Sequence, residues 1–85
     1  MKIVFSKHAR EDKFTMLAKH NFYPTEDDVI EVIKEPEHED KESDKPNIIA
    51  SKGIDEKHVL RVVYRKENDI IKIITFYPAE KGRYY

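Results

Sequence analysis

The sequence has no cysteine, no tryptophan and only two glycines among its 85 residues. The absence of cysteine excludes a disulfide framework and thiolate metal sites and fits a reducing compartment, so we expect a cytoplasmic protein. Two glycines are too few for a glycine-rich phosphate-binding loop. No apolar run approaches the roughly 18 residues of a membrane-spanning helix, and the apolar start at residues 1–5 is too short for a signal peptide. We therefore expect no membrane partner.

Charge is abundant and unevenly placed along the chain. Charged residues make up 39% of the sequence and hydrophobic residues another 39%, enough for one modest core beneath a largely ionised surface. Residues 1–44 hold seven Lys and Arg against twelve Asp and Glu, whereas residues 45–85 hold nine against five. The net charge of −1 therefore hides a basic half that can bind polyanions. The alternative is that so high a charge content produces patches by chance.

The first half of the chain predicts one strand followed by two helices. Residues 2–5 are a β-branched and aromatic run, which is typical of a strand. Ser6 then offers a hydroxyl as the N-cap of a helix over about 7–20. Thr25 and Asp28 have the spacing of a capping box, which predicts the start of a second helix.

The second half changes to the alternation of strands. Residues 37–46 have no apolar residue and predict a solvated acidic loop. Three strands follow at about 48–51, 58–66 and 70–77, with a tight connection at 67–69. We therefore expect the whole 85-residue chain to be one α+β domain of order β-α-α-β-β-β, with two N-terminal helices packed on a mostly antiparallel four-stranded sheet. The first strand is expected to pair with the last.

The predicted hairpin separates its side chains onto two faces if the connection holds two or four residues. The face that packs on the helices would carry Leu60, Val62, Tyr64, Ile71, Ile73, Thr75 and Tyr77. The opposite, open face would carry Arg61, Arg65 and Lys72, mixed with Val59, Val63, Ile74 and Phe76, with Lys66 on it or near it.

Cations on such a face suit phosphate recognition. Guanidinium groups bind phosphate in a bidentate fork and stabilise a pentacovalent phosphorane, whose equatorial oxygens gain charge. The alternative is a solubilising face whose Arg and Lys side chains pair with neighbouring acids. Aromatic side chains near the cations could stack nucleobases. These are Phe76, Tyr84 and Tyr85.

The segment 77–85 gathers acid, base and oxyanion-stabilising side chains within a few positions, namely Glu80, Lys81, Arg83, Tyr84 and Tyr85. Such groups can act on an RNA 2′-hydroxyl and its phosphate without a metal. The alternative is a tail whose aromatic residues cover a hydrophobic edge.

The four histidines carry weaker signals. His8 lies in the first turn of the first predicted helix, and Asp12 lies one turn further on, where it could pair with the imidazole. His38 lies among acids in the predicted loop, and nothing there holds those acids in a metal-binding geometry. His58 opens a predicted strand and gives no independent signal. We expect no metal and no cofactor.

Several stretches together resemble the RelE/ParE-like toxin superfamily of small prokaryotic proteins, in particular its BrnT-like branch and related domains of unknown function. They are the opening Phe-Ser-Lys-His-Ala-Arg at 5–10, the start of the second helix at 24–30, the meander at 60–65 and 73–78, and Lys-Gly-Arg-Tyr-Tyr at 81–85. The resemblance implies cleavage of messenger RNA, free or on the ribosome, and neutralisation by an antitoxin protein.

The resemblance also implies roles for particular residues. The implied catalytic residues are Arg61 and Arg65, which would hold phosphate, Arg83, which would stabilise the transition state, and Tyr84 or Tyr85, which would orient or deprotonate the 2′-hydroxyl. The implied substrate contacts are His8, Arg10, Lys66, Lys72 and Lys81. The chain departs from the family where an arginine is replaced around Asp12 and Lys13, and its net charge is unlike that of ribosome-dependent members. A non-catalytic protein- or nucleoprotein-binding module of the same fold is therefore the alternative.

Overall fold

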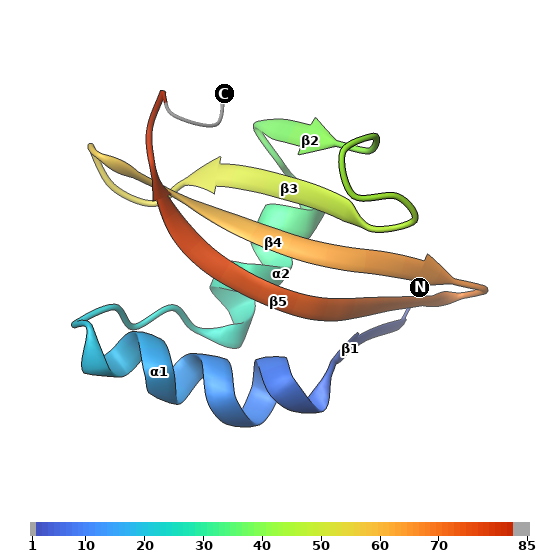
Figure 1. Ribbon diagram of the computed structural model, residues 1–85, viewed down its shortest axis with the longest axis horizontal. Helices are drawn as coiled ribbons and strands as arrows, with labels where there is room; N and C mark the ends of the chain where they lie inside the picture. The colour runs from blue at the N-terminus through green and yellow to red at the C-terminus, as the bar shows by residue number, and fades with distance from the viewer. Residues whose placement is uncertain (1, 83–85) are drawn as a thin grey trace.

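A computed structural model describes residues 2–82, which form a mixed five-stranded sheet with helices on one side (Figure 1). The order across the sheet is β1-β5-β4-β3-β2, in which β1 runs parallel to β5 and the other neighbours are antiparallel. The α+β class and the pairing of the first strand with the last are confirmed. The strands are β1 (Lys2–Phe5), β2 (His38–Asp40), β3 (Ile48–Gly53), β4 (His58–Glu67) and β5 (Ile70–Glu80).

The fifth strand, β2, lies inside the segment that we predicted to be a solvated loop, so the four-strand count is wrong. Its side chains bury no core, but its backbone pairs with β3 at the edge of the sheet, Glu39 opposite Ala50. The chain then turns at Asp40, whose carboxylate accepts hydrogen bonds from the hydroxyl and N–H of Ser43 and from the N–H of Glu42. These bonds lower the pKa of Asp40 to about 2.

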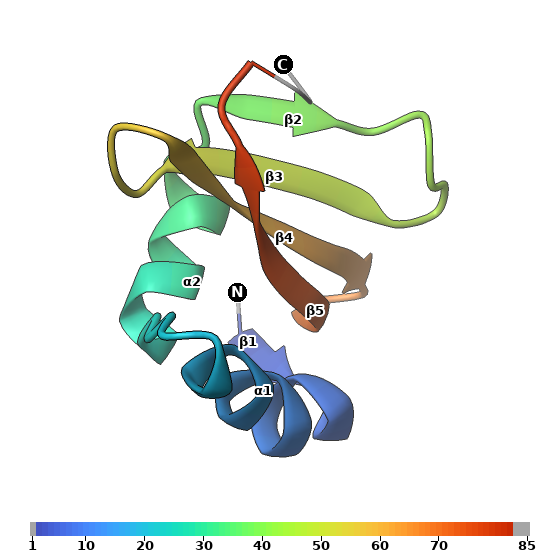
Figure 2. The ribbon, with the colours of Figure 1, turned by 60° about the vertical axis from the view of Figure 1, so that its left-hand side comes forward.

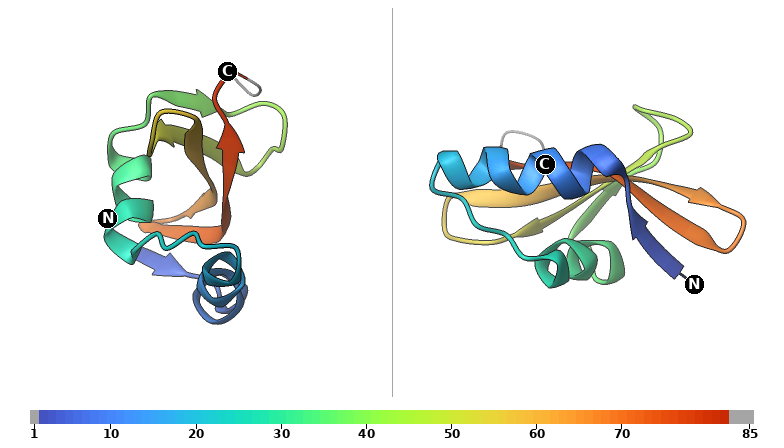
Figure 3. Two further views of the ribbon diagram at one scale, coloured as in Figure 1. Left: turned by 90° about the vertical axis from the view of Figure 1, so that its left-hand side faces the viewer. Right: turned by 90° about the horizontal axis from the view of Figure 1, so that it is seen from below.

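Two helical segments pack on the same face of the sheet (Figures 2 and 3). In the first, the π-helix η1 (His8–Lys13) runs directly into α1 (Phe14–Lys19); the second is α2 (Glu26–Lys34). The Ser6 hydroxyl accepts a 3.1 Å hydrogen bond from the N–H of Ala9, so the predicted cap is confirmed.

The core lies between these helices and the sheet. Both expected capping-box bonds of α2 are present, from the Asp28 N–H to the Thr25 hydroxyl and from the Thr25 N–H to the Asp28 carboxylate. The capping box fixes where α2 begins, and the helix packs against β3 and β4. The buried residues of this core are Ala9, Leu17, Val29, Val32, Ile33, Ala50, Leu60, Val62, Tyr64, Ile71, Ile73 and Phe76.

The hairpin of β4 and β5 follows the prediction only as far as Ile73. Its two-residue connection places Tyr64 opposite Ile73 on the helix face, as expected. At Ile74 the register shifts by one residue, so Val62 lies opposite Phe76 instead of Thr75. Phe76 is therefore fully buried against the helices, and Thr75 and Tyr77 turn to the other face. The predicted faces of these three residues are wrong because an extra residue reverses the alternation beyond it.

β5 also continues past its predicted end at residue 77. Pro78 lies within the strand opposite Leu60, and the strand ends at Glu80. β1 pairs only with residues 70–73 of β5, so the rest of β5 is an edge in the described sheet. An edge strand tolerates proline because its missing N–H faces no neighbour.

Candidate functional site

Four polar side chains form a row across the sheet on the face turned away from the helices. Cross-strand pairing places His38 beside Ser51, Ser51 beside Arg61, and Arg61 beside Tyr77. Directly opposed residues of antiparallel strands project from the same face, and neighbouring strands lie roughly 4.8 Å apart. We call these four residues the outer row.

Arg61 and Tyr77 are joined by direct contacts. The Nε of Arg61 donates a 3.1 Å hydrogen bond to the Tyr77 hydroxyl oxygen, and its guanidinium carbon lies 5.7 Å from the centroid of the Tyr77 ring. The Nζ of Lys13, from η1, lies 5.9 Å from the same centroid. Arg61 is only 7% exposed, although it lies on the face that we predicted to be open. A guanidinium so far from solvent needs fixed polar partners, and the Tyr77 hydroxyl is one of them.

Ser51 lies next to Arg61 in the outer row and is completely buried. No group of the described chain hydrogen-bonds to its hydroxyl. A buried hydroxyl without a partner costs about 1–3 kcal/mol of stability.

The sheet coils strongly, so the end of β5 approaches the start of β2 and the end of β3 (Figures 1 and 2). The Gly53 N–H donates to the Glu37 carboxylate. A Cβ added to Gly53 would lie 3.2 Å from both Oε1 of Glu37 and Nζ of Lys81. Lys81, a predicted substrate contact, is therefore placed beside the outer row, two residues along β3 from Ser51.

The structure does not bring Arg65 to the centre of the outer row. Arg65 lies four residues beyond Arg61 on β4, about 13 Å along the strand. Its Nε and Nη2 bind Oε1 of Glu67 at 2.8 and 2.7 Å. Lys72 lies opposite Arg65, on the face that we predicted. Lys66 lies opposite the buried Ile71 and so belongs to the helix side, which corrects its predicted place.

The two predicted substrate contacts on the first helix, His8 and Arg10, each lie close to a carboxylate of the protein itself. Nδ1 of His8 lies 3.7 Å from Asp12, the pairing that we expected. The guanidinium of Arg10 lies 3.5 Å from Glu26 and 5.4 Å from the centroid of the Phe5 ring, so it ties η1 to α2 and β1. The remaining predicted catalytic residues, Arg83, Tyr84 and Tyr85, lie outside the described residues.

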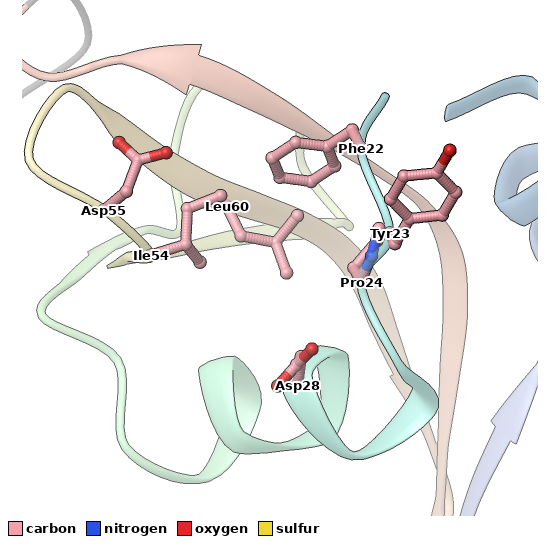
Figure 4. Close-up of a pocket in the computed structure, with 7 residues that line it drawn as sticks. All are labelled: Phe22, Tyr23, Pro24, Asp28, Ile54, Asp55 and Leu60. Carbon is pink, nitrogen blue, oxygen red and sulfur yellow. The ribbon is translucent and has the colours of Figure 1, made fainter. Parts of the chain in front are cut away.

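A cavity of about 180 Å³ opens at the end of the sheet, on the helix side (Figure 4). Asn21, with a left-handed φ of 61°, ends the first helix and leads the chain to the cavity wall. The side chain of Tyr23 on its rim is unusually exposed, at 71%. The lining contains two carboxylates and no Lys or Arg; it consists of Phe22, Tyr23, Pro24, Asp28, Ile54, Asp55 and Leu60.

Asp55 also holds the imidazole of His58. Its carboxylate accepts hydrogen bonds from the backbone N–H groups of Lys57 and His58, at 2.8 and 2.7 Å, and lies 3.0 Å from Nδ1 of His58. The Lys57 N–H is the largest cause of the lowered pKa of Asp55. The spacing of an aspartate three residues before a histidine in a turn is the sequence signal that we overlooked.

Sequence reasoning missed three of the four residues of the outer row. The sequence predicts a loop at His38, indicates no role for Ser51 and predicts that Tyr77 lies on the helix face. The tertiary pairing of β2 with β3 and the shift at Ile74 bring them together. No local pattern in the sequence predicts either the strand pairing or the register shift.

Comparisons with protein-family models, with curated proteins and with solved structures find no match to this chain. The resemblance to the RelE/ParE-like superfamily therefore stays a prediction. Within residues 2–82, no three His, Asp or Glu side chains gather in a metal-binding arrangement. The same part of the chain has no helix long and apolar enough to cross a membrane.

Proposed function

We propose that the protein is a toxin-like endoribonuclease that cleaves RNA without a metal and is neutralised by an antitoxin. The observation that supports this proposal is the buried guanidinium of Arg61, held by the Tyr77 hydroxyl on the face away from the helices. This pair combines a permanent cation with an O–H group, both of which bind phosphate oxygens. The observed element order also agrees with the order that the sequence predicts, apart from the added strand β2.

The proposed reaction is an internal transfer of the phosphate. The 2′-oxygen bonds to phosphorus while the bond from phosphorus to the 5′-oxygen breaks, which leaves a 2′,3′-cyclic phosphate and a 5′-hydroxyl. The 2′ proton passes to Tyr84 or Tyr85, as the resemblance implies, and water protonates the departing 5′-oxygen. The non-bridging oxygens gain negative charge in the transition state, and the Nη groups of Arg61 and the O–H of Tyr77 would bind them there. Arg83 would add a second cation.

Two matched arginine variants test this proposal. Purified protein is incubated with RNA in EDTA, and separately with messenger RNA on ribosomes in their usual buffer. Arg61→Lys keeps the charge but loses the bidentate fork, so cleavage should fall by about 100-fold or more. Arg65→Lys makes the same chemical change away from the outer row and should leave cleavage within a few-fold of the wild type. The Arg83→Ala variant measures how much the terminal segment contributes to cleavage.

The outcome separates an enzyme from a binding module. Cleavage that is lost in Arg61→Lys and kept in Arg65→Lys supports the nuclease. A wild-type protein that cleaves neither free nor ribosome-bound RNA, and does not slow growth when expressed, rules the nuclease out.

The cavity beside Tyr23 favours a second candidate, a non-catalytic protein-binding module. Its floor is apolar, from Phe22 and Leu60, and its rim carries Asp28 and Asp55 without a lining cation (Figure 4). An aromatic face next to carboxylates suits an Arg or Lys side chain of a partner protein. On this hypothesis the protein would capture a basic segment there.

Small probes test this second candidate. N-acetyl-arginine amide should shift the backbone amide signals of residues 22, 23, 54 and 55, and N-acetyl-norleucine amide should not. Tyr23→Ala should abolish the shifts without affecting stability, because the side chain is mostly exposed. Equal shifts with both probes would contradict recognition of a cation.

A further inference from the structure

We infer that protonation of His58 weakens the binding of a basic partner segment at the cavity beside Tyr23. His58 acts through Asp55, a carboxylate that lines the cavity and also binds the imidazole (Figure 4). This inference rests on the second function proposed above, the capture of a basic segment, and adds release of that segment at acid pH.

Asp55 connects the cavity to the histidine. Its two carboxylate oxygens lie 3.0 and 3.1 Å from Nδ1 of His58. The backbone N–H groups of Lys57 and His58 donate to Oδ1 of Asp55 at 2.8 and 2.7 Å, so the turn holds this carboxylate in place. Asp55 also lines a second hollow, of about 320 Å³, together with Glu56, Lys57 and His58. The side chain of His58 is 43% exposed, so it can exchange protons with solvent.

The charge of His58 changes what a cation in the cavity meets. A neutral imidazole donates Nδ1–H to Asp55 and leaves the negative charge of the carboxylate to the ligand. An imidazolium places a positive charge about as close to that carboxylate, where it offsets the negative charge and repels a guanidinium in the cavity. The lowered pKa of Asp55 keeps its carboxylate ionised over the range in which histidines titrate. Acid should therefore weaken the binding of a cation.

The other charged groups around His58 are of types that keep their charge over this range. They are Glu56 and Lys57 in the turn, and Glu80 and Lys81 at the end of β5, where Glu80 lies directly opposite His58. Glutamate and lysine side chains ordinarily titrate well below and well above the range from pH 5 to pH 8, in which histidine changes charge.

Binding of a small cation at two pH values tests the inference. The Kd of N-acetyl-arginine amide is measured on the full chain at pH 8 and pH 5, at constant ionic strength, from the amide signals of residues 22 and 23. The guanidinium of this probe stays charged at both pH values. We expect the Kd to rise by about fivefold at pH 5, at the lower end of the usual coupling range because Asp55 and His58 are both partly exposed.

Two variants identify the group responsible. His58→Asn removes the titrating ring, so its Kd should be the same at pH 5 and pH 8. His20→Asn removes an exposed histidine at the end of α1, two residues before the cavity wall at Phe22, and should keep the fivefold change.

The wild type gives a reciprocal measurement that needs no variant. Coupling between two binding events acts equally in both directions, so the bound probe must oppose protonation of His58. The midpoint of the His58 ring signal in an NMR titration should fall by about 0.7 pH unit when the probe is saturating, which is the same fivefold factor.

Each outcome decides the matter. A fivefold change that is lost in His58→Asn and kept in His20→Asn supports the inference. Equal Kd values at both pH values in the wild type, or a change that persists in His58→Asn, overturn it while the binding function stands. A probe that binds at neither pH overturns the binding function, and this inference fails with it.

Discussion

The hydroxyl of Ser6 donates a 3.0 Å hydrogen bond to the carbonyl oxygen of Ile74, 68 residues away in the sequence. The same hydroxyl accepts from the N–H of Ala9 at the start of the first helix, and the N–H of Ser6 donates to Ile73 at 2.8 Å. Ser6 thus joins the helix cap to the position where β5 changes register. That change of register is what turns Tyr77 towards Arg61.

We predict that Ser6→Ala destabilises the protein by about 1–2 kcal/mol, the usual range for loss of a helix cap. The variant loses the acceptor for Ala9 and the donor to Ile74. Urea unfolding measures the change. Ser6→Thr keeps the hydroxyl and should recover most of the loss. Equal stability of Ser6→Ala and the wild type would contradict the anchoring role of this side chain.

The register shift predicts unequal losses of stability when two neighbouring aromatic residues are replaced. Phe76→Ala should cost about 3–5 kcal/mol of unfolding free energy, because the ring is fully buried against Phe5 and Phe14. Tyr77→Ala, on the other face, should cost clearly less. A larger loss in Tyr77→Ala would show that the strand keeps its simple alternation.

The lowered pKa of Asp40 predicts that the stability of the protein falls as the pH is lowered through the acid range. Its pKa is about 2 in the folded protein and 3.8 in an ordinary environment, so the folded state favours the carboxylate. The contribution of Asp40 is complete above about pH 4 and is lost as the pH falls towards about 2.

Urea unfolding of the wild type and Asp40→Asn at several pH values measures this dependence. The variant should be less stable near neutral pH, and the difference should shrink as Asp40 is protonated. A difference that stays constant across this pH range would show that the carboxylate charge has no part in the turn.

The Arg65–Glu67 ion pair should contribute little stability despite its short distances. Both side chains are substantially exposed, and exposed pairs are typically worth about 0–1 kcal/mol. A double-mutant cycle of Arg65→Ala and Glu67→Ala should give a coupling free energy in that range. A coupling of several kcal/mol would mean that the pair is shielded from solvent.

Much of the fold was predictable because its signals are local. Ser6 as a cap, the Thr25–Asp28 capping box and the pairing of His8 with Asp12 each involve residues within four positions of one another. The alternation of β4 separated Arg61 and Val63 from Leu60 and Val62 correctly. Arg61 was the one residue of the outer row that the sequence singled out.

The rest of the outer row was not predictable from the sequence. β2 has no apolar alternation, since an edge strand forms through its backbone hydrogen bonds and needs no buried side chain. The register shift at Ile74 cannot be recognised in a mostly apolar stretch of sequence. A shift of one residue moves every later side chain to the opposite face of the sheet.

The sequence by itself determined the α+β class, the two capped helices, the β4–β5 hairpin and a basic second half. Those features depend on periodicity, capping and composition, which act over a few residues. The tertiary structure alone decided that His38, Ser51, Arg61 and Tyr77 share one row. Contacts between distant residues set that arrangement, from the pairing of β2 with β3 to the bond between Ser6 and Ile74.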